Sequence, residues 1–231
     1  MSYVAKKYAV ICTRSEDFPP TTQKLIDYYR NAGIEVKVIV GAKSIFQGYQ
    51  AAYDAIKPRP NDVIIMSHDD IQILMDPEKF HLILDSNLKD TVGFIGPAGT
   101  TYLGEDATWW NHEQWRLGKH RGAVFHGDFE EQDLTYFGNY GPVVVLDGLF
   151  LACRASTLKD NILLKPSWFK GEWDFYDILY TFKAHLRGKI NMCVPILLAH
   201  ESRGELAGRE SWHENRKAFL NVYGSYLPRE L

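Results

Sequence analysis

Apolar runs alternate with amphipathic segments in the N-terminal part of the chain. The runs at residues 8–13, 34–40 and 63–66 have the composition of buried strands. Between them, apolar residues recur at helical spacing over residues 21–32 and 45–56, and Gly or Pro residues follow both segments. This order of strands and helices predicts a mostly parallel sheet with flanking helices, as in nucleotide-binding Rossmann-like folds.

The same pattern is lost after residue 96 and returns after residue 142. Gly, Trp, His and charged residues are interspersed in between, so we interpret residues of about 97–142 as an irregular insertion that covers a substrate. We expect the whole chain, residues 1–231, to form a single α/β domain. The further elements predicted are strands at 92–95, 143–146, 149–153 and 190–198, and helices at 76–88, 173–186 and 211–223, the last opened by a capping box of Ser211 and Glu214.

Acids and histidines follow several of the predicted strands. His68, Asp69 and Asp70 come directly after the third strand, and His200 follows the last one. Open α/β sheets bind ligands at the carboxyl ends of their strands, so we expect these side chains to converge. Adjacent carboxylates repel each other unless a hard cation neutralises them, which makes Asp70, with His68 and His200, a candidate site for Mn²⁺ or Mg²⁺. The alternative to a metal site is that Asp69 and Asp70 belong to a solvated loop and that His200 is a hydrogen-bonded surface residue.

Two more acids are candidates for proton transfer. Asp174 and Asp177 lie three residues apart, and so on one face of the predicted helix at 173–186. Either can be a general base, or an acid that is favoured in a first helical turn by the helix macrodipole. The macrodipole explanation fits Asp174 better, so Asp177 is the preferred base.

The composition narrows the class of protein. The net charge of −3 gives no strong basic field, which argues against tight nonspecific binding of nucleic acid. Three cysteines in apolar surroundings indicate buried thiols in a reducing compartment, and we find neither a signal peptide nor an apolar run that could span a bilayer. We therefore expect a cytoplasmic protein. No glycine-rich dinucleotide fingerprint, P-loop or serine-hydrolase elbow is present.

Several short motifs occur in the order typical of family 2-like glycosyltransferases with the GT-A fold. The resemblance covers residues of about 60–225 and is nearest to the branch related to the StrF protein. The motifs are Ser67–Asp70, Gly93–Gly99, Trp109-Trp110, Leu146–Ala152, Phe175–Asp177, Ala184–Gly188 and His200–Gly204.

The resemblance implies a nucleotide-sugar donor, a divalent metal and inversion at the anomeric carbon, and we expect a UDP-sugar. The D-x-D signature of the family falls on His68-Asp69-Asp70, which makes Asp70 the preferred metal ligand. Asp177 matches the first acid of the helix motif that holds the base. Leu179 replaces the second acid, so Asp174 stays an alternative base. The donor-binding residues implied are Thr13, Arg14, Ser15, Asp69, Asp147 and Gly148.

The acceptor is not indicated by any motif. A glycan, a lipid carrier, a metabolite, a protein or a modified nucleic acid would all suit a site whose acceptor side is built by the segment at about 97–142. Two other functions stay open from the sequence. One is nucleotidyl transfer, although residues 13–17 lack the basic, glycine-rich phosphate loop of such enzymes. The other is an inactive glycan-binding or scaffold module.

Overall fold

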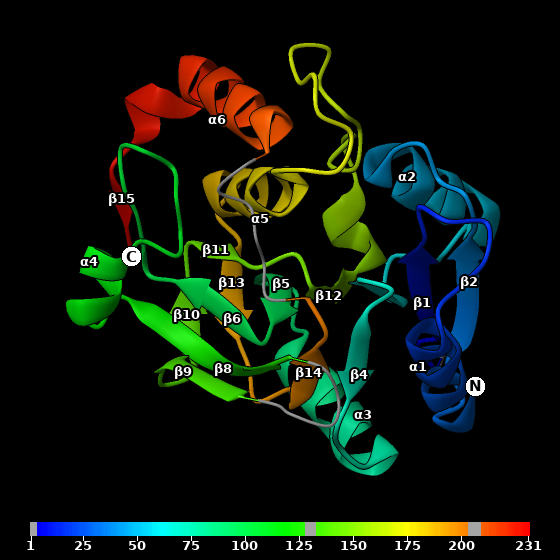
Figure 1. Cartoon of the computed structure of the whole chain (residues 1–231). Helices are drawn as coiled ribbons and strands as arrows, with labels where there is room; N and C mark the ends of the chain where they lie inside the picture. Colours follow the sequence, from blue (N-terminus) through cyan, green and yellow to red (C-terminus); the bar gives the residue numbers. More distant parts are fainter. Residues whose placement is uncertain (1–3, 128–132, 203–208) are drawn as a thin grey trace.

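A seven-stranded sheet passes through the middle of the computed structural model, which describes residues 4–127, 133–202 and 209–231 (Figure 1). Five of its strands run parallel, and two run against them: β12, between β3 and β5, and β10 at one edge. Its strand order is β10 (Gly141–Val143), β13 (Ile190–Cys193), β5 (Val92–Gly96), β12 (Phe150–Arg154), β3 (Val63–Ser67), β1 (Lys7–Cys12) and β2 (Glu35–Ile39).

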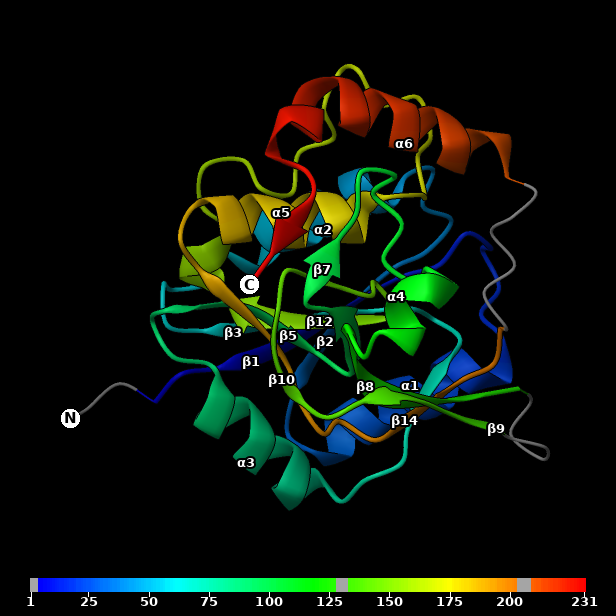
Figure 2. The same cartoon turned by 90° about the vertical axis from the view of Figure 1, so that its left-hand side faces the viewer.

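Helices cover both faces of this sheet. In both views α2 and α5 lie on one side and α1 and α3 on the other, with α6 outside α5 (Figures 1 and 2). The helices are α1 (Pro20–Asn31), α2 (Ile45–Ile56), α3 (Pro77–Asn87), α4 (His112–Arg116), α5 (Tyr176–Leu186) and α6 (Glu210–Tyr223), with 3-10 turns at Ala155–Leu158 and Gly224–Tyr226. Among the residues that the structure describes, we find no helix with the length and apolar character needed to cross a bilayer.

A smaller sheet packs beside the central one and carries most of the predicted insertion. Its order is β11 (Val145–Leu146), β6 (Ala98–Thr100), β8 (His120–His126), β14 (Leu198–His200) and β4 (Ile71–Ile73), and β9 (Asp133–Gly138) pairs with β8. A two-stranded ribbon of β7 (Tyr102–Leu103) and β15 (Arg229–Glu230) completes the fold. The segment predicted to be irregular therefore contains regular strands and a short helix.

Local sequence explains several features of these elements. The five residues of β3 are all buried, which is why its sequence is apolar without alternation. Asp76 caps α3 by accepting a hydrogen bond from the backbone N–H of Glu78, and Pro77 occupies the first turn. After α1, Gly33 adopts the left-handed backbone conformation (φ 69°) that favours glycine at a helix end.

Two predicted elements are wrong in ways that affect the site. The predicted helix at 173–186 starts at Tyr176, because Phe175 has a left-handed conformation (φ 69°) and ends the preceding loop. Asp174 therefore precedes the helix and does not share a face with Asp177. The predicted capping box is also wrong: α6 shows no side-chain cap, and the hydroxyl of Ser211 donates instead to Asp174.

The predicted strand at 190–198 is in fact two strands in different sheets. Pro195 lies between β13, in the central sheet, and β14, in the smaller one. Proline has no N–H to donate and is disfavoured inside a sheet, which explains the break. The break carries His200, at the end of β14, over to the loop that follows β3, where its Nε2 lies 3.3 Å from Oδ1 of Asp70.

Candidate active site

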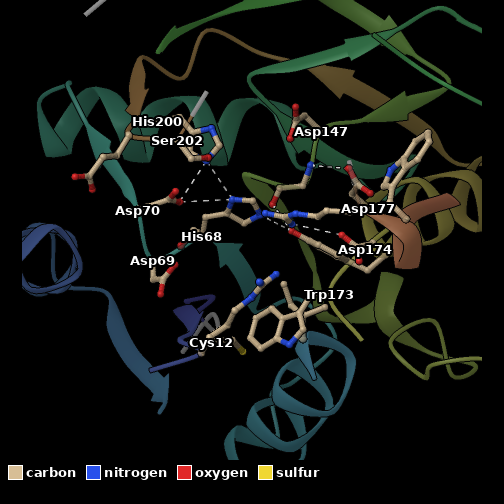
Figure 3. A pocket seen from close by; sticks show the side chains of 18 of the residues that line it. Cys12, His68, Asp69, Asp70, Asp147, Trp173, Asp174, Asp177, His200 and Ser202 are labelled. Carbon is tan, nitrogen blue, oxygen red and sulfur yellow. Dashed lines mark hydrogen bonds and ion pairs between the residues drawn. The ribbon is translucent and has the colours of Figure 1, made fainter. Parts of the chain in front are cut away.

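A cavity of about 1090 Å³ opens where β1, β3 and β14 end (Figure 3). Thr13 does not line it: this side chain is fully buried, and its hydroxyl donates to the carbonyl oxygen of Ser15 at 2.7 Å. Thr13 therefore shapes the loop beside the cavity. The other residues singled out by the sequence all line the cavity: Arg14, Ser15, His68, Asp69, Asp70, Asp147, Gly148, Asp174, Asp177 and His200.

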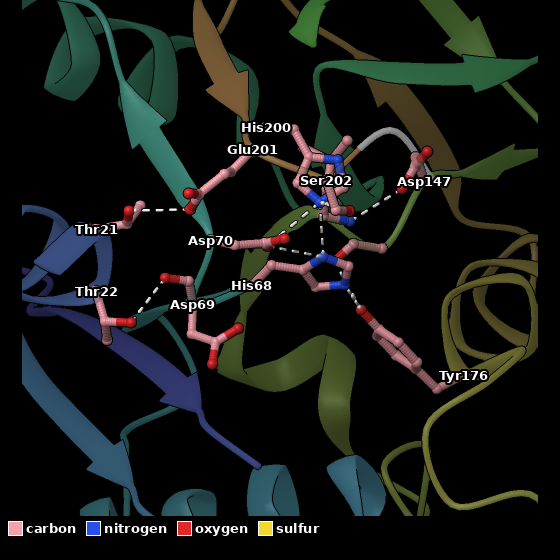
Figure 4. A network of polar contacts seen from close by, with 12 residues as sticks. Thr21, Thr22, His68, Asp69, Asp70, Asp147, Tyr176, His200, Glu201 and Ser202 are labelled. Carbon is pink, nitrogen blue, oxygen red and sulfur yellow. Dashed lines mark hydrogen bonds and ion pairs between the residues drawn. The ribbon is translucent and has the colours of Figure 1, made fainter. Parts of the chain in front are cut away.

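His68, Asp70 and His200 form a cluster on one side of this cavity (Figure 4). Nε2 of His200 lies 3.3 Å from both Nδ1 of His68 and Oδ1 of Asp70, and Nδ1 of His68 lies 3.7 Å from the same carboxylate oxygen. One ligand atom from each residue lies within 4.8 Å of the other two, a spacing that would allow the three to share one cation. The structure thus brings together the three residues that the sequence assigned to a metal.

The members of this cluster shift one another's pKa values. Burial works to raise the pKa of Asp70, but the hydrogen bond with His200 and the charges of both histidines hold it well below its usual value. Burial and the neighbouring His200 lower the pKa of His68 to about 4. Burial also acts to lower the pKa of His200, yet its hydrogen bond with Asp70 and the charge of that carboxylate raise it overall. At neutral pH the cluster therefore contains a carboxylate and a neutral His68.

The first turn of α1 holds the two loops of the cluster together (Figure 4). Thr21 donates its hydroxyl hydrogen to Oε2 of Glu201 at 3.0 Å, and Thr22 donates to the carbonyl oxygen of Asp69 at 2.8 Å. The backbone N–H of Glu201 donates to the carbonyl oxygen of Asp70 at 2.9 Å. These bonds fix the loop after β3 against the loop after β14.

Asp147 and Asp177 form a second acidic group in the cavity. Burial and the charge of Asp147 raise the pKa of Asp177 to about 7, and burial also raises the pKa of Asp147. Asp177 accepts a hydrogen bond from the backbone N–H of Gly148 at 3.1 Å, and Asp147 accepts one from that of Leu149 at 3.0 Å. A carboxylate whose conjugate acid has a pKa near 7 is suited to accept a proton at neutral pH.

Asp174 is held by α6. The hydroxyl of Ser211 donates to its Oδ2 at 2.6 Å, and Nη1 of Arg209 lies 3.5 Å from its Oδ1. The amide of Asn215 donates to its carbonyl oxygen at 3.0 Å. The residue is 6 % exposed, and these bonds have a structural role because they join the loop before α5 to α6.

The loop after β1 places a cation over an aromatic ring. The guanidinium carbon of Arg14 lies 4.6 Å from the ring centre of Trp173, a cation–π contact. Burial and the charge of Arg209 lower the pKa of Arg14, which still leaves it charged at neutral pH. Two guanidinium groups therefore lie near one another in the cavity that also holds the histidine and aspartate cluster.

Several residues of the cavity were not singled out from the sequence, among them Tyr176, His126, Arg209 and Trp212. Tyr176 lies inside a motif, but nothing in the motif assigned it a role. His126 belongs to a strand that the pattern did not reveal, and Arg209 and Trp212 come from the start of α6, far from the other motifs in the chain. The ring centre of Trp212 lies 5.3 Å from that of Trp110, and both rings line the cavity.

The fold and this cavity define an α/β protein that gathers acids and histidines at the carboxyl ends of its strands. A model of the "Glycosyltransferase like family" matches residues 21–223. The chain belongs to this family, and it is a glycosyltransferase. A search of curated protein sequences gives no match.

A solved structure shares the fold at low sequence identity. The structure of GalNAc-T7 with UDP, GalNAc and Mn²⁺ superimposes with a TM-score of 0.56 at 12 % identity, over 94 % of this chain and 48 % of that one. This chain thus spans about half the length of that neighbour. A glycosyltransferase involved in the glycosylation of the major capsid of PBCV-1 is similar with a TM-score of 0.37 at 7 % identity, over 90 % and 98 % of the two chains. The inositol-1-phosphate CTP transferase from T. maritima has a TM-score of 0.39 at 11 % identity, over 94 % of this chain and 97 % of that one.

Proposed function

We propose that this glycosyltransferase moves a sugar from a nucleoside diphosphate donor, a UDP-sugar in our expectation, to an acceptor hydroxyl with inversion. The observation that carries the proposal is the presence of the His68–Asp70–His200 cluster and the weakly acidic Asp177 in one cavity. The first group suits a cation and a diphosphate, and the second suits proton transfer.

The donor atoms of the cluster fit a divalent cation. Two imidazole nitrogens and a carboxylate oxygen converge within 4.8 Å, and other ligand positions stay available for water or phosphate. Mg²⁺ is bound mainly by oxygen ligands, whereas Mn²⁺ accepts imidazole readily, so two histidines favour Mn²⁺. A bound cation would offset the negative charge that develops on the departing diphosphate.

The residues around the cluster suit the rest of the donor. Arg14, whose guanidinium carbon lies 4.6 Å from the ring centre of Trp173, adds a positive charge for phosphate oxygens, and the Trp173 ring offers a stacking surface for a nucleobase. Ser15, Asp69 and Gly148 line the same cavity and complete the proposed donor site. Trp110 lies in the segment at about 97–142 and also lines the cavity, which supports our interpretation that this segment contributes the acceptor side.

Asp177 is the proposed base. In an inverting displacement the acceptor hydroxyl attacks from the face opposite the diphosphate, so the base must lie across the sugar from the cation. Asp70 belongs to the cluster, whereas Asp177 lies on another side of the cavity (Figure 3). Its pKa of about 7 lets it take up the hydroxyl proton near neutral pH. Asp174, bonded to Ser211, is the reserve candidate.

The proposal is tested by incubating the purified protein with a panel of nucleotide sugars, with and without Mn²⁺. We expect Mn²⁺-dependent stabilisation by one donor in thermal shift, because a ligand that binds only the folded state raises the melting temperature. We also expect slow release of the nucleoside diphosphate, rather than of pyrophosphate as in nucleotidyl transfer. NMR of the product should show the inverted anomer. Stabilisation by donors that is the same without any divalent cation would contradict the cation site.

A further inference from the structure

The hydroxyl of Tyr176 lies between a ring nitrogen of the cluster and a backbone carbonyl. Its oxygen is 2.9 Å from Nε2 of His68 and 2.8 Å from the carbonyl oxygen of Gly148 (Figure 4). The residue is 4 % exposed, and the rings of Phe46, Tyr49 and Tyr180 pack around its own ring at centre distances between 5.8 and 6.3 Å. The hydroxyl is therefore held in one place.

The direction of each hydrogen bond follows from the number of hydrogens. A phenol has one hydrogen, and a carbonyl oxygen can only accept, so Tyr176 donates to Gly148. The phenol oxygen is then left as an acceptor for His68, which requires a hydrogen on Nε2 of the imidazole. A neutral imidazole carries one such hydrogen, so Nδ1 of His68 has a free lone pair.

The free lone pair of Nδ1 points toward the rest of the cluster. Nδ1 is the atom of His68 that faces Nε2 of His200 at 3.3 Å and Oδ1 of Asp70 at 3.7 Å. Without Tyr176 the opposite tautomer would be favoured, because a hydrogen on Nδ1 would face the carboxylate of Asp70. That hydrogen would occupy the atom that a cation needs.

We propose that Tyr176 is a positioning residue that keeps His68 in its Nε2–H tautomer and so reserves Nδ1 for a divalent cation. The proposal rests on the cation site of the proposed function. A carboxylate or a carbonyl group that accepts a hydrogen bond from a metal-binding histidine commonly fixes its tautomer. Here the acceptor is the phenol oxygen of Tyr176, whose own hydrogen is donated to the carbonyl oxygen of Gly148.

The same backbone segment also positions the proposed base. The N–H of Gly148 donates to Asp177, and the carbonyl oxygen of Gly148 accepts from Tyr176. Tyr176 directly precedes Asp177 in the chain. A Cβ atom at Gly148 would lie 2.4 Å from the hydroxyl oxygen of Tyr176 and 2.8 Å from Cβ of Asp177. Only glycine fits at position 148. The first two residues of α5, Tyr176 and Asp177, are thus the residue that orients the metal ligand and the proposed base.

The test compares Tyr176→Phe with Tyr180→Phe as a matched control. Tyr180 lies one turn later on α5, is buried, and donates its hydroxyl hydrogen to the carbonyl oxygen of Leu163 at 2.9 Å. Both changes remove one buried hydroxyl that donates to a carbonyl, but only the first touches His68. Mn²⁺ binding alone, followed by electron paramagnetic resonance, should weaken by about 10-fold or more in Tyr176→Phe. It should be unchanged in Tyr180→Phe.

The tautomer is read directly from the ¹⁵N resonances of the metal-free protein. We expect the Nε2–H form of His68 in the parent and the Nδ1–H form in Tyr176→Phe. An Nδ1–H form in the parent, or equal Mn²⁺ affinity in parent and Tyr176→Phe, would overturn the proposal. Failure of the proposed function gives a different result: the parent would bind no Mn²⁺, while its ¹⁵N spectrum would still show whether Tyr176 sets the tautomer.

Discussion

Asp70 and Asp177 carry the same side chain in the same cavity, yet their surroundings shift their pKa values in opposite directions. Asp70 has two histidines beside it, and its pKa stays well below the usual value. Asp177 is buried beside another acid, Asp147, and its pKa rises to about 7. Two acids with separated pKa values can do different work, one as a permanent anion and the other as a proton acceptor. Substitution of either acid should therefore have a distinct effect.

The largest effect is expected from Asp177→Asn. The amide keeps the shape of the carboxylate and can accept the hydrogen bond from Gly148, but it cannot take a proton. We expect kcat to fall by a factor on the order of 10² or more, with donor binding retained. Asp174→Asn is the control: its partner is Ser211, so it should alter stability more than turnover. Normal turnover in Asp177→Asn with an inactive Asp174→Asn would reverse the two roles.

Asp70→Asn should act on the cation instead. The substitution removes the negative charge of the cluster while keeping its size, so Mn²⁺ affinity should fall by roughly 10- to 100-fold in calorimetry. Asp69→Asn removes the same charge from the neighbouring residue, whose carboxylate is not part of the cluster, and should cost much less Mn²⁺ affinity. Equal losses in the two variants would mean that general charge, rather than coordination by Asp70, attracts the cation.

The rate should depend on pH through Asp177. Its pKa is raised to about 7, and only the deprotonated form can act as a base. At saturating donor and Mn²⁺, kcat should therefore be level above neutral pH and fall about tenfold for each pH unit below it. The residual rate of Asp177→Asn should lack this dependence. A parent profile that is flat between pH 5.5 and 8.5 would exclude Asp177 as the base.

The sequence predicted the framework of this cavity better than its details. The strand of residues 63–66 and the acids after it were found because a buried parallel strand is apolar throughout and ends abruptly. The position of Asp174 was missed, because the left-handed backbone of Phe175 leaves no trace in an apolar pattern.

Contacts between residues far apart in the chain could not be predicted from the pattern of apolar and polar positions either. Tyr176 bonds to His68, which lies 108 positions away, and no local spacing encodes that contact. The strands within residues 97–142 were missed because Gly, His and charged residues interrupt their apolar pattern. Pairing between strands defines them, as β8 with β9.

The smallest effect is a gain in stability in Asp177→Asn. The pKa of Asp177 is near 4 in an unfolded chain and about 7 in the folded one, so the folded state binds its proton more tightly. The free energy of unfolding contributed by this group is therefore fully present below pH 4 and is lost as the pH rises toward 7. An amide carries no such charge, and the variant should be more stable than the parent at pH 8, by on the order of 1 kcal/mol.

Urea unfolding of the metal-free parent and Asp177→Asn at pH 5 and pH 8 measures this gain. The difference between the two proteins should be larger at pH 8, because the parent carries the full buried charge beside Asp147 only there. Asp70→Asn provides the opposite case: it removes a carboxylate that two histidines stabilise, so it should lower the free energy of unfolding at pH 8. If both substitutions destabilise the protein equally at pH 8, the two acids do not differ in their surroundings as the structure indicates.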